Sequence, residues 1–137
     1  MPMQVELVSP EGILYEGEAQ MVVARTVGGG DIAFMAGHVP FIASLAVHPV
    51  KILHEGGGAT LIAVHRGFVE VSNDRVSILS DTAELARDID VPRAEAAKSQ
   101  AEERLRAAPD DAVAAAALER ALVRLATARG SLTVASH

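Results

Sequence analysis

The sequence predicts an α+β fold, in which an antiparallel β-sandwich over residues 1–88 precedes an antiparallel two-helix hairpin over residues 89–137. Two observations predict it. Before residue 88, short apolar runs alternate with polar residues and are broken by glycine, which is the period-two pattern of strands with one buried face. From Arg93 to Arg129 there is no glycine, alanine is abundant, and apolar residues recur every three or four positions, as in amphipathic helices.

Strand signals fill the first half at intervals of about ten residues, a spacing typical of a sandwich or flattened barrel. The predicted strands are 4–8, 13–18, 21–27, 31–35, 43–45, 50–54, 60–64, 67–72 and 75–79. Turn signals separate them, among them Gly28-Gly29-Gly30, His48-Pro49 and Asn73-Asp74. Because Asn and Asp tolerate positive φ, Asn73-Asp74 predicts a tight two-residue hairpin loop.

Helix signals begin at the end of the sandwich. The first helix is expected over about 91–107, with Asp90 accepting from free amides of the first turn and Pro92 needing no donor there. Pro109 ends it, and a second helix is expected over about 112–129, followed by Gly130 as a C′ residue. The short loop between them makes the helices antiparallel neighbours.

The apolar stripes of both helices consist mainly of alanine. A buried methyl group contributes about 0.8 kcal/mol, against about 2–3 kcal/mol for a buried leucine, while alanine has the highest helix propensity. Stable helices with weak contacts between them are therefore expected. Two interpretations stay open: the hairpin docks reversibly, or it is an ordinary helix pair packed once.

Charge and composition exclude several classes of function. Residues 1–88 hold 5 Lys/Arg and 11 Asp/Glu, a net charge of −6, and residues 89–137 hold 7 of each. An acidic body disfavours binding to nucleic acid or anionic lipid. Aromatic residues make up only 3% of the chain, so base-stacking surfaces are poorly supported. The absence of a long apolar run or signal peptide predicts a cytosolic location without membrane insertion.

Catalytic and metal-binding patterns are missing from the sequence. There is no cysteine, and the spacings of the histidines in the first half fit no common zinc site. The run Gly28-Gly29-Gly30-Asp31 lacks the Lys-Ser/Thr of a phosphate loop. No catalytic residue and no metal are therefore expected. An alternative hypothesis, a small β-barrel enzyme using His38 and His65, predicts bound metal.

One candidate binding site lies where the two halves meet. In an antiparallel hairpin the late part of the second helix returns beside the start of the first, so Arg93, Arg120 and Arg124 are expected to converge near a helix N-terminus that favours anions. Three guanidinium groups there suit polyphosphate, with Asp90 and Glu84 available to an adenine amino group or a ribose hydroxyl. The alternative is that these arginines form surface ion pairs with Asp90 and Glu84, each worth about 0–1 kcal/mol.

Almost the whole chain resembles the epsilon subunit of bacterial F-type ATP synthase. The resemblance is carried by VELVSPEG (5–12), GHVP (37–40), GFVEV (67–71), VSILSDTAE (76–84) and DIDVPRA (88–94), in that order and spacing. It implies a ten-stranded sandwich, two C-terminal helices and a non-catalytic place in the rotor's central stalk. The implied partners are the gamma subunit and the ring of c subunits, with Asp31 and His38 on loops at the end of the sandwich that faces the ring.

The same resemblance implies a regulatory role without an obligatory cofactor. Residues 89–94 correspond to the family's nucleotide motif, so ATP is expected as a regulatory ligand of Glu84, Ile89, Asp90, Arg93, Ala94, Arg120 and Arg124. Gln100 stands where ATP-binding members tend to have an arginine. The helices are expected to extend toward the catalytic alpha and beta subunits and restrain ATP hydrolysis, at the cytoplasmic face of the bacterial plasma membrane. A free-standing ATP-sensing module without a rotor partner is the alternative.

Overall fold

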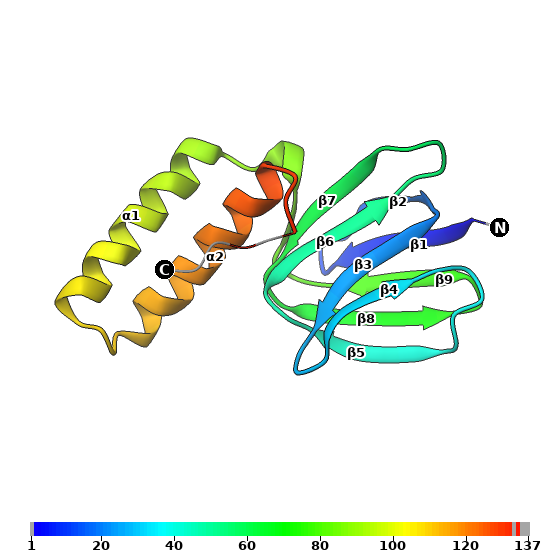
Figure 1. The fold of residues 1–137 in the computed structure, drawn as a ribbon, viewed down its shortest axis with the longest axis horizontal. Helices are drawn as coiled ribbons and strands as arrows, with labels where there is room; N and C mark the ends of the chain where they lie inside the picture. Colours follow the sequence, from blue (N-terminus) through cyan, green and yellow to red (C-terminus); the bar gives the residue numbers. More distant parts are fainter. Residues whose placement is uncertain (1, 133, 135–137) are drawn as a thin grey trace.

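A computed structural model describes residues 2–132 and residue 134 (Figure 1). The β-strands form one body and the two helices lie beside one end of it, with α2 between α1 and the strands (Figure 1). The strands are β1 (Met3–Ser9), β2 (Gly12–Ala19), β3 (Met21–Thr26), β4 (Gly30–Phe34), β5 (Phe41–Leu45), β6 (His48–Leu53), β7 (Ala59–Val64), β8 (Gly67–Ser72), β9 (Arg75–Leu79) and β10 (Ala83–Leu85). The predicted sandwich followed by two helices is confirmed.

The ten strands form a continuous hydrogen-bonded sheet that folds over to enclose one core (Figure 1). Their order is β10-β7-β6-β3-β5-β8-β9-β1-β2, and β4 pairs with β3. Every described strand pair is antiparallel except β1 with β9, which runs parallel from Gln4↔Arg75 to Val8↔Leu79. The purely antiparallel prediction misses this pair because period-two patterning reports burial and not strand direction.

Alternating burial along the strands builds the core. Met3, Val5 and Leu7 of β1 point inward. Phe34, at the end of β4, is fully buried, and its ring lies 5.7 Å from that of Phe41. The sandwich therefore has a dense apolar interior of its own, separate from the hairpin.

Two local predictions are wrong. His48-Pro49, expected as a turn, begins β6, where Pro49 pairs with Ala63 of β7. Proline is tolerated there because β3 pairs only with Lys51–Leu53 of β6, so Pro49 lacks a strand neighbour on that side. Strand β10 also has no counterpart among the nine predicted segments, since three residues are too few to show alternation.

The predicted hairpin loop between β8 and β9 is confirmed. Asn73 has φ 51° and Asp74 has φ 60°, so both central residues adopt the left-handed conformation of a type I′ turn. The Asp74 carboxylate also accepts a hydrogen bond of 2.7 Å from the amide of Gly37. This bond ties the loop after β4 to the same end of the sandwich.

The helices begin and end close to the predicted residues. A short 3₁₀ turn η1 (Ala86–Asp88) leads to α1 (Val91–Ala107) and then α2 (Ala112–Ala128). Asp90 caps α1, as predicted, by accepting from the amide of Arg93 at 3.1 Å. Gly130 has φ 73°, and the amides of Gly130 and Ser131 donate to the carbonyls of Thr127 and Ala126. This is a Schellman motif, which supplies partners to the last carbonyls of α2.

The hairpin is held by two small apolar clusters. Between the helices, Ala101 of α1 packs with Leu118 and Leu122 of α2. Between α2 and the sandwich, Val123 packs with Ala63 of β7 and Ile89 of the junction, flanked by Val47 and Ala128. The second cluster is much smaller than the sandwich core. Neither described helix is long and apolar enough to cross a membrane.

Candidate functional site

A polar pocket of about 400 Å³ lies at the junction of the two halves. Its lining residues come from β10, from the segment before α1, from the first turns of α1 and from α2. They are Glu84, Asp88, Asp90, Arg93, Ala94, Ala97 and Arg124. Five of the seven residues predicted for a nucleotide site therefore line one pocket, and the antiparallel hairpin brings them together as expected.

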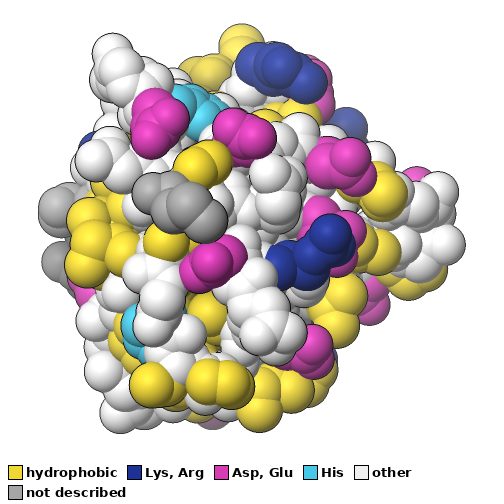
Figure 2. Space-filling model, turned by 90° about the vertical axis from the view of Figure 1, so that its right-hand side faces the viewer, with side chains coloured by type: hydrophobic (Ala, Val, Ile, Leu, Met, Phe, Trp, Pro, Cys, Tyr) yellow, Lys and Arg dark blue, Asp and Glu magenta, His cyan; other side chains and the backbone are white. Residues whose placement is uncertain are grey.

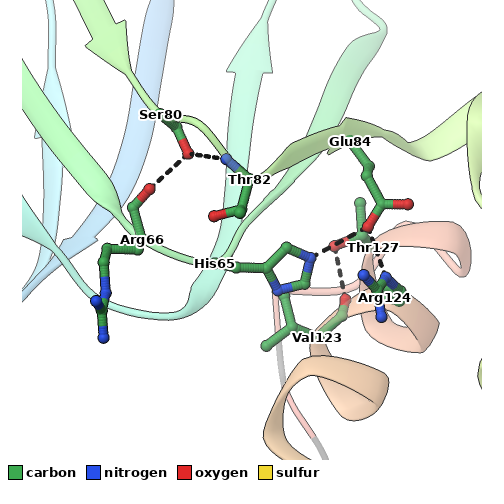
Figure 3. Close-up of polar contacts among 8 residues, drawn as sticks. All are labelled: His65, Arg66, Ser80, Thr82, Glu84, Val123, Arg124 and Thr127. Carbon is green, nitrogen blue, oxygen red and sulfur yellow. Dashed lines mark hydrogen bonds and ion pairs between the residues drawn. The ribbon is translucent and has the colours of Figure 1, made fainter. Parts of the chain in front are cut away.

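Glu84 connects the sandwich to the hairpin within this site. Its Oε1 accepts a hydrogen bond of 2.6 Å from Nε of Arg124 on α2 and lies 3.2 Å from Nε2 of His65, which follows β7 (Figure 3). The Glu84 and Arg124 side chains are each 33% exposed. The alternative of an ion pair between these residues is thus realised for Arg124, which holds α2 against β10.

The same contacts shift two pKa values downward. Partial burial acts to raise the pKa of Glu84, but hydrogen bonding and positive charge from Arg124 outweigh it, with a smaller contribution from His65, so the pKa lies below the ordinary value. For His65, burial is the main cause that lowers the pKa. The charges of Arg124 and Arg120 add to that effect, and the hydrogen bond with Glu84 opposes it.

Asp90 and Arg93 differ in the interactions that their side chains make within the chain. Asp90 Oδ1 is occupied by the capping bond from the amide of Arg93. The Arg93 side chain is exposed, lines the pocket and makes no ion pair with any residue in the described ranges. A guanidinium group without an ion-pair partner among the described residues, at the N-terminal end of a helix dipole, is suited to an anionic ligand.

Two predicted site residues do not line the pocket. Ile89 is 9% exposed and packs against Ala63 and Val123 beneath the site, so its role is to fix the junction. Arg120 lies on an exposed part of α2, one turn before Arg124, and its charge is felt by His65. The expectation of three converging arginines is therefore met by Arg93 and Arg124 only.

The expectation that Asp31 and His38 lie on loops at one shared end of the sandwich is wrong. Asp31 lies within β4, opposite Arg25 of β3, and forms an ion pair of 2.9 Å with it. His38 lies beyond the other end of β4, where its ring meets that of Phe34 edge-on. The residues between them include the extended end of β4, which separates the two side chains.

The pocket-lining residues Asp88 and Ala97 were not predicted for the site, and neither was His65, which contacts Glu84. Asp88 lines the pocket, and its place two residues before Asp90 was the only sequence signal for it. His65 had none, because a histidine after an apolar strand does not reveal its tertiary partner. Among the residues whose positions are described, no three His, Asp or Glu side chains are grouped to hold a metal ion.

Comparison with known families identifies the architecture around this pocket. Residues 2–86 match the model of the ATP synthase delta/epsilon chain β-sandwich domain, and residues 87–129 match that of the long α-helix domain. The chain belongs to the delta/epsilon-chain family of ATP synthases. Within this family it is a non-catalytic stalk subunit of the ATP synthase complex.

Bacterial epsilon chains are close relatives over most or all of the sequence. The chain is 42% identical to the ATP synthase epsilon chain of Halalkalibacterium halodurans over 98% of both chains. It is 48% identical to that of Brevibacillus brevis over 75% of this chain and 77% of the relative. A chain of the Euglena gracilis mitochondrial ATP synthase shares the fold, with a TM-score of 0.74 at 24% identity, over 96% of this chain and 82% of that chain.

Proposed function

We propose that the chain couples the proton-driven rotor to the catalytic head and restrains ATP hydrolysis through its C-terminal hairpin. In this proposal the sandwich binds the gamma subunit and the ring of c subunits. The hairpin alternates between the docked position of Figure 1 and an extended position against the alpha and beta subunits. ATP bound at the junction favours the docked position and so relieves inhibition.

The observation that carries the regulatory part is the composite origin of the pocket. Glu84 belongs to the sandwich, whereas Arg93 and Arg124 belong to the two helices. When the hairpin leaves the sandwich, Arg124 leaves Glu84 and the pocket no longer exists. A ligand of this pocket therefore binds the docked state alone.

Linkage gives the size of the effect. A ligand that binds one of two states stabilises it by RT ln(1 + [L]/Kd), which is about 2.7 kcal/mol at a hundredfold excess over Kd. The apolar contact that ATP would reinforce is formed mainly by Val123, Ala63 and Ile89. An effect of this size is thus sufficient to shift a hairpin held by so small a cluster.

Replacing Arg93 with alanine is expected to weaken ATP binding to the full chain by at least about tenfold, because a charge-assisted contact to phosphate is worth about 1.5–3 kcal/mol. The measurement is isothermal titration calorimetry with ATP. Arg87→Ala is the matched control, since Arg87 is an exposed arginine of η1 that does not line the pocket. Wild-type protein that gives no heat at millimolar ATP would contradict nucleotide binding and leave the stalk role intact.

An exposed apolar face of the sandwich supports the proposed binding to gamma. Ile42 of β5, Phe68 of β8 and Leu79 of β9 are 67%, 52% and 45% exposed. Phe68 lies opposite Leu79 in the sheet, and both border a hollow of about 460 Å³ together with Val8 and Pro10. Large apolar side chains gathered on one face indicate a protein-binding surface.

Charging this face is expected to release the subunit from the complex. Phe68→Asp should reduce co-purification with gamma from native membranes at least about tenfold, because a buried unpaired charge costs several kcal/mol at an interface. Phe68→Leu keeps the face apolar and should retain binding. If Phe68→Asp co-purifies as well as wild type, this face does not bind gamma. If wild-type chain elutes alone, the free-standing ATP-sensing module is favoured.

The surface charge fits a subunit that works among proteins on the cytoplasmic side of the membrane. Figure 2 looks onto the end of the sandwich away from the helices, where acidic side chains are spread among hydrophobic ones and basic side chains are sparse. Such a surface favours contact with protein over contact with anionic lipid. Asp31 and His38 lie toward opposite ends of β4. Both residues therefore contact partner subunits only if those subunits cover two ends of the sandwich.

A further inference from the structure

His65 occupies an unusual position beneath the contact between the sandwich and α2. Its side chain is 5% exposed, and Nε2 lies 3.2 Å from Oε1 of Glu84 (Figure 3). Nδ1 is buried and has no hydrogen-bond partner among the described residues. The ring thus fits the site as a neutral imidazole that donates from Nε2 to Glu84 and leaves a bare lone pair at Nδ1.

A proton added to His65 is poorly accommodated while the hairpin is docked. It would sit on Nδ1, as a buried N–H without an acceptor, which is costly to leave unsatisfied. Burial lowers the pKa of His65 and outweighs the hydrogen bond with Glu84, which favours the imidazolium ion. Arg124 and Arg120, both on α2, repel the added positive charge.

The undocked state removes these penalties. When α2 leaves, both arginines leave with it and the ring gains access to water, which can accept from Nδ1. Glu84 stays beside His65 because β10 pairs with β7 within the sandwich. The other charged residues that line the pocket with Glu84 and Arg124 are Asp88 and Asp90, before α1, and Arg93 in its first turn.

We infer that the His65–Glu84–Arg124 chain is a proton-sensitive latch, in which protonation of His65 releases the hairpin from the sandwich. The inference rests on the mobile hairpin of the proposed function, but it does not require nucleotide binding. His65 acts here through Glu84 and contacts no ligand of the pocket.

The direction of the pH effect follows from where the proton binds more tightly. In the docked structure the pKa of His65 lies below its ordinary value of 6.5, mainly through burial, and the charges of Arg124 and Arg120 on α2 lower it further. The docked state therefore binds fewer protons, and docking is strongest above about pH 6.5 and weakens as the pH falls through the lowered value. Glu84, whose pKa is also lowered by docking contacts, adds to the release only below its ordinary value of 4.5.

Förster resonance energy transfer between two dyes on the full chain tests the latch. Because the chain has no cysteine, Ser44→Cys on β5 and Ala115→Cys on α2, both exposed, give one label on each body. Between pH 7.5 and 5.0 the transfer efficiency of wild type is expected to change in one step, as the released fraction rises at least about fivefold. His65→Gln, which keeps a donor to Glu84 but does not titrate, should lose the step. His38→Gln, the same change at a histidine remote from α2, should keep it.

Two results would overturn the inference: a step that persists in His65→Gln, or no step in the wild type. Moderate urea at pH 7.5 distinguishes failure of the latch from failure of the proposed function. A hairpin that urea releases and acid does not is still mobile, so the proposed function stands and the latch does not. A hairpin that neither urea nor acid releases contradicts both the latch and the mobile hairpin of the proposed function. If His65→Gln does not fold, NMR titration of His65 in the wild type replaces it. In that titration the His65 ring must change protonation over the same pH range as the transfer efficiency changes. Titration at an unrelated pH overturns the latch.

Discussion

Replacing Phe34 with alanine is expected to lower the free energy of unfolding of the sandwich by about 3–5 kcal/mol. The Phe34 side chain is fully buried at the end of β4, and its ring contacts those of His38 and Phe41 at centroid distances of 5.1 and 5.7 Å. The change removes apolar burial and the aromatic contacts together, and it leaves a cavity in a packed interior. Urea unfolding followed by circular dichroism measures the loss.

Phe68→Ala is the matched control for this prediction. Phe68 is 52% exposed on the outer face of β8, so the same substitution there should change the free energy of unfolding by less than about 1 kcal/mol. Equal losses from the two variants would mean that Phe34 does not occupy the core. Because the hairpin does not contribute to the cluster that holds Phe34, the effect should also leave α1 and α2 helical.

Replacing Val123 with aspartate is expected to detach the hairpin from the sandwich. The Val123 side chain is fully buried between α2 and β7, against Ala63 and Ile89. An unpaired carboxylate in that cluster costs several kcal/mol. At about 3 kcal/mol the docking equilibrium shifts roughly a hundredfold, since each 1.4 kcal/mol is a factor of ten. Amide hydrogen exchange should report loss of protection where β7 and β10 meet α2.

Val113→Asp makes the same change on an exposed surface of the same helix, where the side chain is 67% exposed. It should leave docking unchanged and keep the helix content of the wild type. Val123→Asp should also keep its helices, because alanine-rich segments with capped ends hold local structure. If the whole sandwich unfolds with Val123→Asp, the two halves are one cooperative unit and the modular account is wrong.

Local chemistry made the hairpin predictable in detail. Asp90 as a cap, Pro109 as a break and Gly130 after α2 each act within a few residues, so the helix bounds follow from the chain alone. The Asn73-Asp74 loop was predictable for the same reason. Strand pairing was less accessible, since the parallel contact of β1 with β9 joins segments about 70 residues apart and leaves no local pattern.

The candidate site shows the same division. Topology brought Arg93, Arg124 and Glu84 to one pocket, and an antiparallel helix pair makes that convergence predictable. Arg120 and Arg124 share one face of α2, but the position of α2 along its axis was not predictable to one turn, and Arg120 lies outside the pocket. His65 was missed because its role depends on which helix face covers the end of β7, and that is a tertiary fact.

The reversible docking of the hairpin is tested most directly by one distance distribution. Spin labels on Ser44→Cys and Ala115→Cys of the full chain allow pulsed EPR between β5 and α2. In wild type we expect a narrow distribution at the docked distance, which ATP narrows further. In Val123→Asp we expect a broad distribution with the sandwich still folded. An identical narrow distribution in wild type, Val113→Asp and Val123→Asp, unchanged by ATP, would contradict reversible docking.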